Sequence, residues 1–376
     1  MLAAMSEFDL IARYFTRPTP RAALGVGDDC ALLRPTPGTQ LAISCDMLVE
    51  GRHFFADVDP AALGHKALAV NLSDLAACGA TPVAFTLALA LPQADETWLA
   101  PFAHGLLALA DAHGCELIGG DTTKGPLNIC ITVFGEVPVV NGKSQALLRS
   151  GAQVGDDLYV SGTLGDARLA LDALRGTIAL PADLLAQARQ RLERPTPRVA
   201  LGQALRGVAS AALDISDGLL GDLQHILKAS GVGATIDTSI AINLIAASAH
   251  PTWTKGLFSL NTATTKVLPL RSVCTAHVPE PQWPPTGGSW AVPTSQEAEP
   301  LLNQQLDYVL AGGDDYELAF TAPVSARQAV HAAAHASQTP VTRIGQIDAA
   351  LGLRLVDGQG RPVAIPSQFR SFDHFA

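Results

Sequence analysis

Apolar residues recur at helical spacing in some segments of the chain and form strand-like runs in others. This difference predicts where the helices and strands lie. Residues 60–79 and 95–113 repeat apolar side chains at helical spacing. Residues 81–92 and 127–137 are long apolar runs, which are typical of buried strands. A short helix capped by Ser6 and two further strands complete this part of the chain, at 6–15, 39–46 and 115–121.

A second unit of strands and helices is predicted after residue 150. Its expected strands are 155–162, 211–216 and the run that follows the Gly-rich turn at 312–313, and its expected helices are 166–174, 182–191, 197–205 and 217–230. The alternation of strands and helices indicates an α/β (α+β) fold with sheets layered by helices. A chain of 376 residues suits two domains. We place them at 1–150 and 151–376.

One segment of the second unit, 245–305, shows neither the helical spacing nor the alternation that is typical of strands. It is rich in Pro, Ser and Thr and contains three of the four tryptophans, at Trp253, Trp283 and Trp290. Long segments without periodicity are uncommon within compact domains. We therefore expect an insertion here.

Composition and charge narrow the classes of function. Apolar residues make up 48% of the chain and charged residues 16%, which excludes global disorder. The formal net charge of −10 does not favour nucleic acid as a partner. The N-terminus lacks the pattern of a signal peptide and no long uncharged apolar run occurs, so we expect no membrane association. The six cysteines show no metal-site spacing and are read as reduced thiols of a soluble, cytoplasmic protein.

Short acidic motifs that also contain small residues are the candidates for a metal-binding or catalytic site. Each is also an ordinary turn or cap sequence when taken alone, but six of them, several at predicted strand ends, favour a shared role. Carboxylates from several strand ends that converge would suit Mg²⁺, which takes oxygen ligands and phosphates. The motifs are Gly25–Asp29, Ser44–Asp46, Asn71–Asp74, Gly119–Thr123, Asp214–Gly218 and Gly312–Asp315.

Two familiar routes to ATP chemistry are absent from the sequence. There is no G-x-x-x-x-G-K-[ST] motif and no H-R-D motif, which excludes a P-loop NTPase and a protein kinase. Among the basic residues, Lys66 is read as a solvated residue of the 60–79 helix. Arg149 is equally compatible with a phosphate contact or a surface position, and His53 with a substrate contact or simple packing.

Eight motifs together resemble the thiamine-monophosphate kinase family, part of the superfamily typified by aminoimidazole-ribonucleotide synthetase. The resemblance covers about residues 6–240 and 307–376. In chain order the motifs are GVGDDCA (25–31), SCDMLVEGRHF (44–54), NLSDLAACGATP (71–82), IGGDTTKGP (118–126), RSGAQVGD (149–156), LDISDGL (213–219), GGDDYELAFT (312–321) and SFDHF (371–375).

The resemblance implies an activity and a set of partners. The family transfers the γ-phosphoryl group of ATP directly, in line, to thiamine monophosphate, and this yields thiamine diphosphate in the biosynthesis of that cofactor. It implies several Mg²⁺ ions, a PurM-like fold and a homodimer formed through the N-terminal, ATP- and Mg-binding domain. No residue would act covalently; Asp46, Asp74 and Asp121 would act through metals.

The resemblance also implies residue roles. The expected metal ligands are Asp28, Ser44, Cys45, Asp46, Asp74, Asp121, Asp214 and Asp217. The expected ATP contacts are Gly120, Asp121, Arg149 and Ser216. The expected substrate contacts are His53, Asp314 and Phe372.

Two departures from the family pattern and two alternative functions stay open. Cys45 replaces a common Thr, which weakens a metal site only if the hydroxyl is the ligand, and the 245–300 stretch has no counterpart in the family pattern. The alternatives are another superfamily enzyme, such as a selenophosphate or aminoimidazole-ribonucleotide synthetase, and a non-catalytic metal-stabilised scaffold. The VEGRHF and FDHF motifs favour the kinase.

Overall fold

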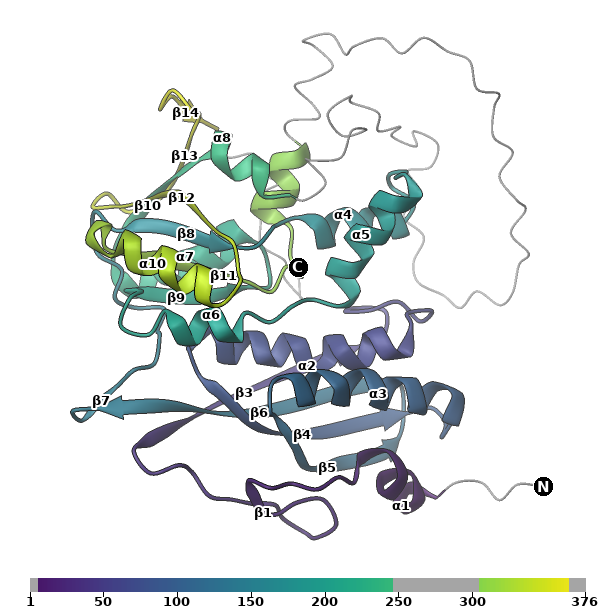
Figure 1. Cartoon of the computed structure of the whole chain (residues 1–376). Helices are drawn as coiled ribbons and strands as arrows, with labels where there is room; N and C mark the ends of the chain where they lie inside the picture. Colours follow the sequence, from purple (N-terminus) through teal and green to yellow (C-terminus); the bar gives the residue numbers. More distant parts are fainter. Residues whose placement is uncertain (1–5, 246–303, 365–376) are drawn as a thin grey trace, which may run out of the picture.

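The protein is a two-domain, mixed α/β structure in which two sheets are separated by helices (Figure 1). The computed structural model describes residues 6–245 and 304–364. The insertion predicted at 245–305 therefore lies outside the described residues, except for residue 245 and residues 304–305 at its ends. Phe372, the third predicted substrate contact, also lies outside them. Within the described ranges, no helix is both long and apolar enough to cross a bilayer.

The first sheet has the strand order β3-β6-β4-β5 and carries two of the six acidic motifs, on β3 and β5. β6 pairs antiparallel with both β3 and β4, whereas β4 and β5 are parallel. A small ribbon, β1–β2, forms a sheet of its own, and β7 extends β6. The bounds are β1 Ala22–Leu24, β2 Leu32–Leu33, β3 Thr39–Val49, β4 Thr81–Leu91, β5 Glu116–Lys124, β6 Asn128–Val140 and β7 Lys143–Ser144; the helices are α1 Glu7–Leu10, the π-helix Ile11–Phe15, α2 Pro60–Ala77 and α3 Glu96–Ala112.

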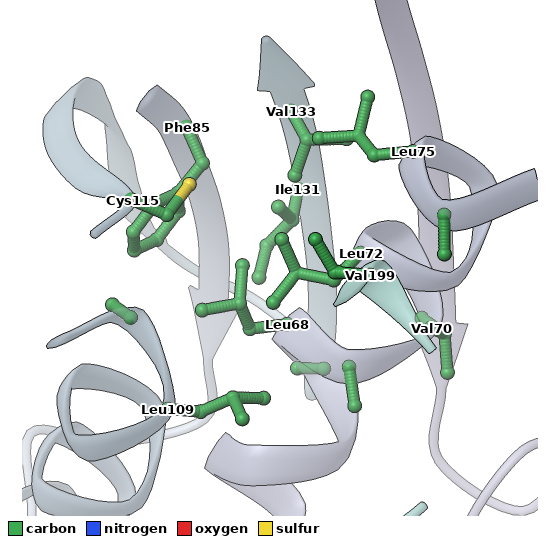
Figure 2. Packing of buried hydrophobic residues seen from close by; sticks show 14 of the residues in the cluster. Leu68, Val70, Leu72, Leu75, Phe85, Leu109, Cys115, Ile131, Val133 and Val199 are labelled. Atoms are coloured by element: carbon green, nitrogen blue, oxygen red, sulfur yellow. The ribbon is translucent and has the colours of Figure 1, made fainter. Parts of the chain in front are cut away.

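Helix α2 forms the centre of the molecule, between the first sheet and the second domain (Figure 1). Asp59 caps it by accepting a hydrogen bond from the backbone N of Ala62 at 2.7 Å, and Pro60 occupies its first turn. Figure 2 shows Leu68 and Leu72 of α2 among side chains of β4, β6 and α3. α3 can approach α2 closely because residue 105 is glycine: a Cβ there would lie 1.9 Å from the carbonyl oxygen of Ala61.

The second sheet has the order β14-β13-β10-β12-β8-β11-β9 and is mainly antiparallel. β9 and β11 lie at the edge that contacts α2. A helix at 304–311 leads into β11. The other bounds are β8 Asp157–Ser161, β9 Ala211–Ile215, β10 Gly233–Asp237, β11 Glu317–Ala322, β12 Val341–Asp348, β13 Gly352–Val356 and β14 Pro362–Val363, with α4 Asp166–Leu174, α5 Ala182–Glu193, α6 Val199–Ala204, α7 Leu219–Ser230, α8 Thr238–Ala241 and α10 Arg327–Ala336.

The structure corrects the placement of two acidic motifs. Asp46 and Asp121 were predicted at the ends of their strands but lie inside β3 and β5, whereas Asp74 lies within α2, as the helix predicted at 60–79 implies. β3 continues beyond Asp46 because its partner β6 supplies backbone hydrogen-bonding positions as far as the Val49↔Asn128 pair. Asp28, Asp217 and Asp314 are the acidic candidates that do lie outside helices and strands.

Candidate active site

Strand β3 presents Ser44 and Asp46 toward helix α2. Successive residues of a strand point to opposite faces, so Cys45, between them, is exposed on the other face. Its Sγ atom lies 3.5 Å from Sγ of Cys130. The backbone carbonyl of Cys45, rather than its thiol, is therefore the group available to a ligand beside Asp46.

Helix α2 joins this strand to the second domain through polar side chains in its last two turns. Ser44 Oγ donates a hydrogen bond to the Asp74 carboxylate. Ser73 Oγ donates to Oδ2 of Asp214 on β9 at 2.9 Å. We call Asp46, Asp74 and Asp214 the acidic cluster. Their carboxylates come from β3, α2 and β9, so both domains contribute to it.

Burial and mutual repulsion dominate the electrostatics of the acidic cluster. Burial, followed by the charge of Asp74, raises the pKa of Asp46 to about 6. The same two causes raise the pKa of Asp214 to about 8, although the hydrogen bond from Ser73 opposes the shift. Burial also raises the pKa of Asp74, and the charge of Arg149 lowers it in part. Carboxylates that repel one another in this way favour a bound cation.

The loop after β9 is held beside the acidic cluster by a buried carboxylate. Oδ2 of Asp222 accepts hydrogen bonds from the backbone N atoms of Ser216 and Asp217, both at 3.0 Å. Burial raises the pKa of Asp222 to about 6, while these amide hydrogen bonds oppose the shift. These hydrogen bonds fix the backbone of Ser216, a predicted ATP contact, and of Asp217, a predicted metal ligand.

Asp121 lies in the same sheet as Asp46 but on a distant strand. The register aligns Asp46 with Ile131, Leu87 and Gly120 in one row across β3, β6, β4 and β5. Three strand spacings separate β3 from β5, about 14 Å. Within one chain, the strand order therefore keeps Asp46 and Asp121, two predicted metal ligands, apart.

A pocket with about 300 Å³ of empty space adjoins Asp121, and we call it the β5 pocket. Its walls are mostly apolar, and a Cβ at Gly120 would lie 1.9 Å from the carbonyl oxygen of Leu87, so only glycine fits there. Asp28 is exposed on the loop that begins near Val26, another residue of this pocket. The residues that line it are Ile11, Phe15, Val26, Leu87, Leu117, Gly119, Gly120, Asp121 and Thr122.

A larger pocket, with about 590 Å³ of empty space, lies between the two domains. We call it the interdomain pocket. Two of the three predicted substrate contacts, His53 and Asp314, line it together. His53 Nδ1 accepts a hydrogen bond from the backbone N of Val49 at 3.0 Å, which fixes the ring beside the end of β3. The apolar walls include Phe54, Leu63, Leu171 and Leu192.

Sequence reasoning missed the role of Lys66. It was read as a solvated lysine, but it is 3% exposed, and its Nζ lies 3.1 Å from Oδ1 of Asp314. The physical reason is that α2 is covered on nearly all sides, so a lysine in it needs a buried partner. The lack of any other Lys or Arg in 60–77 was the signal that could have indicated this.

The oxygen donors of the acidic cluster suit Mg²⁺ in type, but they do not form a closed cage. Among the described residues, no three or more His, Cys, Asp or Glu side chains are already grouped closely enough to hold an ion between them. Mg²⁺ commonly takes one or two carboxylates and completes its shell with phosphates and water. The set of carboxylates and the Ser44 hydroxyl fits this mode of binding.

The raised pKa values lead to a prediction for the metal-free protein. A carboxyl whose folded pKa exceeds its unfolded value stabilises the fold at low pH, and this stability is lost as pH rises through the folded pKa. For Asp214, with a pKa of about 8, we expect the free energy of unfolding in EDTA to fall on the order of 1 kcal/mol between about pH 7 and 9. Thermal melts of the parent and of Asp214→Asn measure this.

The Asp214→Asn protein is the control, because it lacks the titrating group and its stability should fall less over the same range. Mg²⁺ should reduce the loss in the parent. A parent protein whose melting temperature falls no more than that of the variant between about pH 7 and 9 would contradict the prediction.

Both domains match known protein families. Residues 27–137 match AIR synthase related protein, N-terminal domain, and residues 153–358 match AIR synthase related protein, C-terminal domain, so fold and site define a protein of the AIR synthase related class. Thiamine-monophosphate kinase of Salmonella typhimurium is 42% identical over 378 residues and 99% of each chain. The chain belongs to the thiamine-monophosphate kinase family and is an enzyme of that family.

Solved structures agree with this assignment. The crystal structure of thiamine-monophosphate kinase from Stenotrophomonas maltophilia is 40% identical, with a TM-score of 0.69, and the match covers 94% of this chain and 95% of that one. AaThiL complexed with AMPPCP and TMP is 25% identical, with a TM-score of 0.62 over 88% of each chain. The expected family and the PurM-like fold are therefore confirmed.

Proposed function

We propose that the chain transfers the γ-phosphoryl group of ATP directly to the phosphate of thiamine monophosphate, with Mg²⁺, to form thiamine diphosphate. The observation that carries the proposal is the acidic cluster, which lies between the domains beside the interdomain pocket. The names of its relatives and the AMPPCP and TMP bound to AaThiL support both substrates.

The interdomain pocket and the acidic cluster are close neighbours. The charges of Asp314, in the pocket, and of Asp46 and Asp214, in the cluster, all raise the pKa of Tyr316 after the effect of its burial. In addition, the backbone N of Asp314 donates to the carbonyl oxygen of Ser216 at 2.8 Å. A phosphate ester held in the pocket would thus place its phosphate near the cluster and the predicted ATP contact at Ser216.

Transfer between two phosphates needs alignment and charge neutralisation more than covalent chemistry. The accepting oxygen is already ionised, so no general base is required. Asp46, Asp74 and Asp214, with Ser44 and the carbonyl of Cys45, would hold Mg²⁺, which when bound offsets the charge of the two phosphates. Asp28, Asp121 and Asp217 would hold further ions nearer the nucleotide.

The nucleotide is proposed to extend from the acidic cluster to the β5 pocket. Gly120 permits close backbone approach there, and the apolar walls of the pocket suit an aromatic base. Arg149 is exposed, and its positive charge lowers the pKa of Asp74, which supports a role for its guanidinium in binding phosphate. His53 and Asp314 are proposed to contact the thiamine portion in the interdomain pocket.

We also propose a homodimer formed through the outer face of β3. Leu41, Ile43 and Met47 alternate along that face and are 43%, 59% and 52% exposed. Exposed apolar rows of this kind mark protein interfaces. A second copy of the chain is the proposed occupant, as the family resemblance implies.

The prediction for this face is that Ile43→Asp converts the dimer to a monomer, because a carboxylate in an apolar interface is costly. Light scattering after size exclusion, at micromolar protein concentration, measures the mass. Val154→Asp is the matched control, since Val154 is 59% exposed but lies outside β3. A parent protein that is already monomeric would refute the proposal.

The catalytic proposal is tested by incubating the protein with ATP, Mg²⁺ and thiamine monophosphate. Formation of thiamine diphosphate together with ADP supports it. If no thiamine diphosphate forms at any Mg²⁺ concentration, the proposed activity is wrong.

A further inference from the structure

The ion pair between Lys66 and Asp314 joins the two domains at the interdomain pocket. Lys66 belongs to α2, whereas Asp314 belongs to the loop between the 304–311 helix and β11. Both residues line the pocket, but the Lys66 side chain is 4% exposed and that of Asp314 is 31% exposed, so the carboxylate is the more accessible partner. Lys66 Nζ also donates to the carbonyl oxygen of His53 at 3.4 Å.

Several contacts fix Asp314 in an unusual position. Its φ of 65° lies in the left-handed region, which few residues other than glycine adopt without support. The support comes from its backbone N, which donates to Ser216 O at 2.8 Å, and from the Tyr316 hydroxyl, which donates to Oδ1 at 3.1 Å. Lys66 contacts the same Oδ1 atom. In the described structure Oδ2 is thus the oxygen that a ligand in the pocket would meet.

The chemistry of the pocket indicates what this oxygen would bind. Its walls combine apolar surface from Phe54, Leu171 and Leu192 with two carboxylates, Asp314 and Glu193, and with the basic side chains of Arg52, Lys66 and Arg175. Glu193 is already paired with Arg189 at 2.7 Å. Both carboxylates are thus paired, but Lys66 and Tyr316 contact only Oδ1 of Asp314, so its Oδ2 is the acceptor that we assign to a positively charged or amino-bearing aromatic ring.

We propose that Lys66 is a positioning residue: it holds the Asp314 carboxylate in the orientation that binds the cationic aromatic portion of the acceptor substrate. This inference rests on the proposed function, which supplies a phosphate ester of that chemistry. Lys66 acts through Asp314 and not on ATP, because the link from Asp314 to the ATP-side loop is a backbone hydrogen bond that does not involve the lysine.

The test compares Lys66→Met, Asp314→Asn and the double variant. Each single change should raise KM for thiamine monophosphate about tenfold, with KM for ATP within about twofold of the parent. The double variant should also show an increase of about tenfold, not about a hundredfold, because both changes remove one interaction. Lys228→Met, which removes an exposed lysine in the last turn of α7, is the control and should leave both KM values unchanged.

The outcomes separate this inference from the proposed function. If the parent forms no thiamine diphosphate, the proposed function fails and not the inference about Lys66. If the parent is active but the effects of the two changes multiply, Lys66 acts independently of Asp314 and the inference is wrong. An equal rise in KM for ATP also contradicts it. Should Lys66→Met fail to fold, Asp314→Asn and the double variant still decide the matter. A double variant whose KM for thiamine monophosphate is clearly higher than that of Asp314→Asn overturns the proposal.

Discussion

Replacement of Asp74 by asparagine is expected to lower the rate of thiamine diphosphate formation by about a thousandfold or more, which corresponds to about 4 kcal/mol of transition-state stabilisation. Asparagine keeps the size of the side chain and an oxygen for the Ser44 hydroxyl, but it removes the negative charge. A neutral ligand binds Mg²⁺ less well, so the charge of the two phosphates would be poorly neutralised. Initial rates of product formation at saturating Mg²⁺ measure the effect.

The same change should not harm the fold. Burial raises the pKa of Asp74, which means that the charged form is held at a cost in free energy. The free energy of unfolding of the metal-free variant at pH 8 should therefore equal or exceed that of the parent. Asp111→Asn is the control, because Asp111 is exposed and pairs with Arg17 at the surface. Loss of stability without loss of turnover would instead favour the scaffold alternative.

Replacement of Glu317 by glutamine is expected to lower the free energy of unfolding by about 3–5 kcal/mol. Glu317 is fully buried in β11 and accepts hydrogen bonds at 2.6 Å from Ser161, Arg191 and Arg198. Glutamine fits the space but leaves two largely buried guanidinium groups without a compensating charge. The midpoint and slope of urea unfolding measure the effect.

Glu96→Gln is the matched control for this prediction. Glu96 pairs with Arg13, and both side chains are about half exposed, so the loss should be below about 1 kcal/mol. Glu317 also follows directly after the loop that holds Asp314 and Tyr316, so we expect its replacement to loosen the interdomain pocket. An unfolding free energy for Glu317→Gln within about 1 kcal/mol of the parent would show that the buried charge network adds little.

Much of the local structure could be predicted because its signals are local. The helix predicted at 60–79 is confirmed as Pro60–Ala77, since its apolar spacing, the proline in its first turn and the glycine after its end all lie within the segment. The strand predicted at 39–46 was placed correctly but ended too early. Its true end at Val49 depends on pairing with Asn128 of β6, about 80 residues later in the chain.

The sequence could not show that the site residues lie together, because their contacts also join distant parts of the chain. Asp214 reaches the acidic cluster because β9 packs on α2, and Ser73 then donates to it. The separation of Asp121 from Asp46 depends on the strand order of the first sheet, which no local pattern states. The family resemblance identified these residues as a set but not their distances.

The interpretation of Lys66 as a solvated residue was wrong for a different reason. A charged residue in a helix is usually solvated, and this general preference led to the wrong interpretation. Burial of α2 between a sheet and a second domain reverses the preference, and the lysine is satisfied by Asp314, which is distant in sequence. Its function follows from a tertiary contact and not from its position in the helix.

The most direct test of the account uses ATP labelled in its γ-phosphate, with thiamine monophosphate as acceptor, in the presence of Mg²⁺ or of EDTA. The label should appear in the terminal phosphate of thiamine diphosphate with Mg²⁺, and it should be absent with EDTA and nearly absent with Asp74→Asn. Equal transfer of the label by the Asp74→Asn protein, or in EDTA, would contradict the central claim that the acidic cluster supports phosphoryl transfer through Mg²⁺.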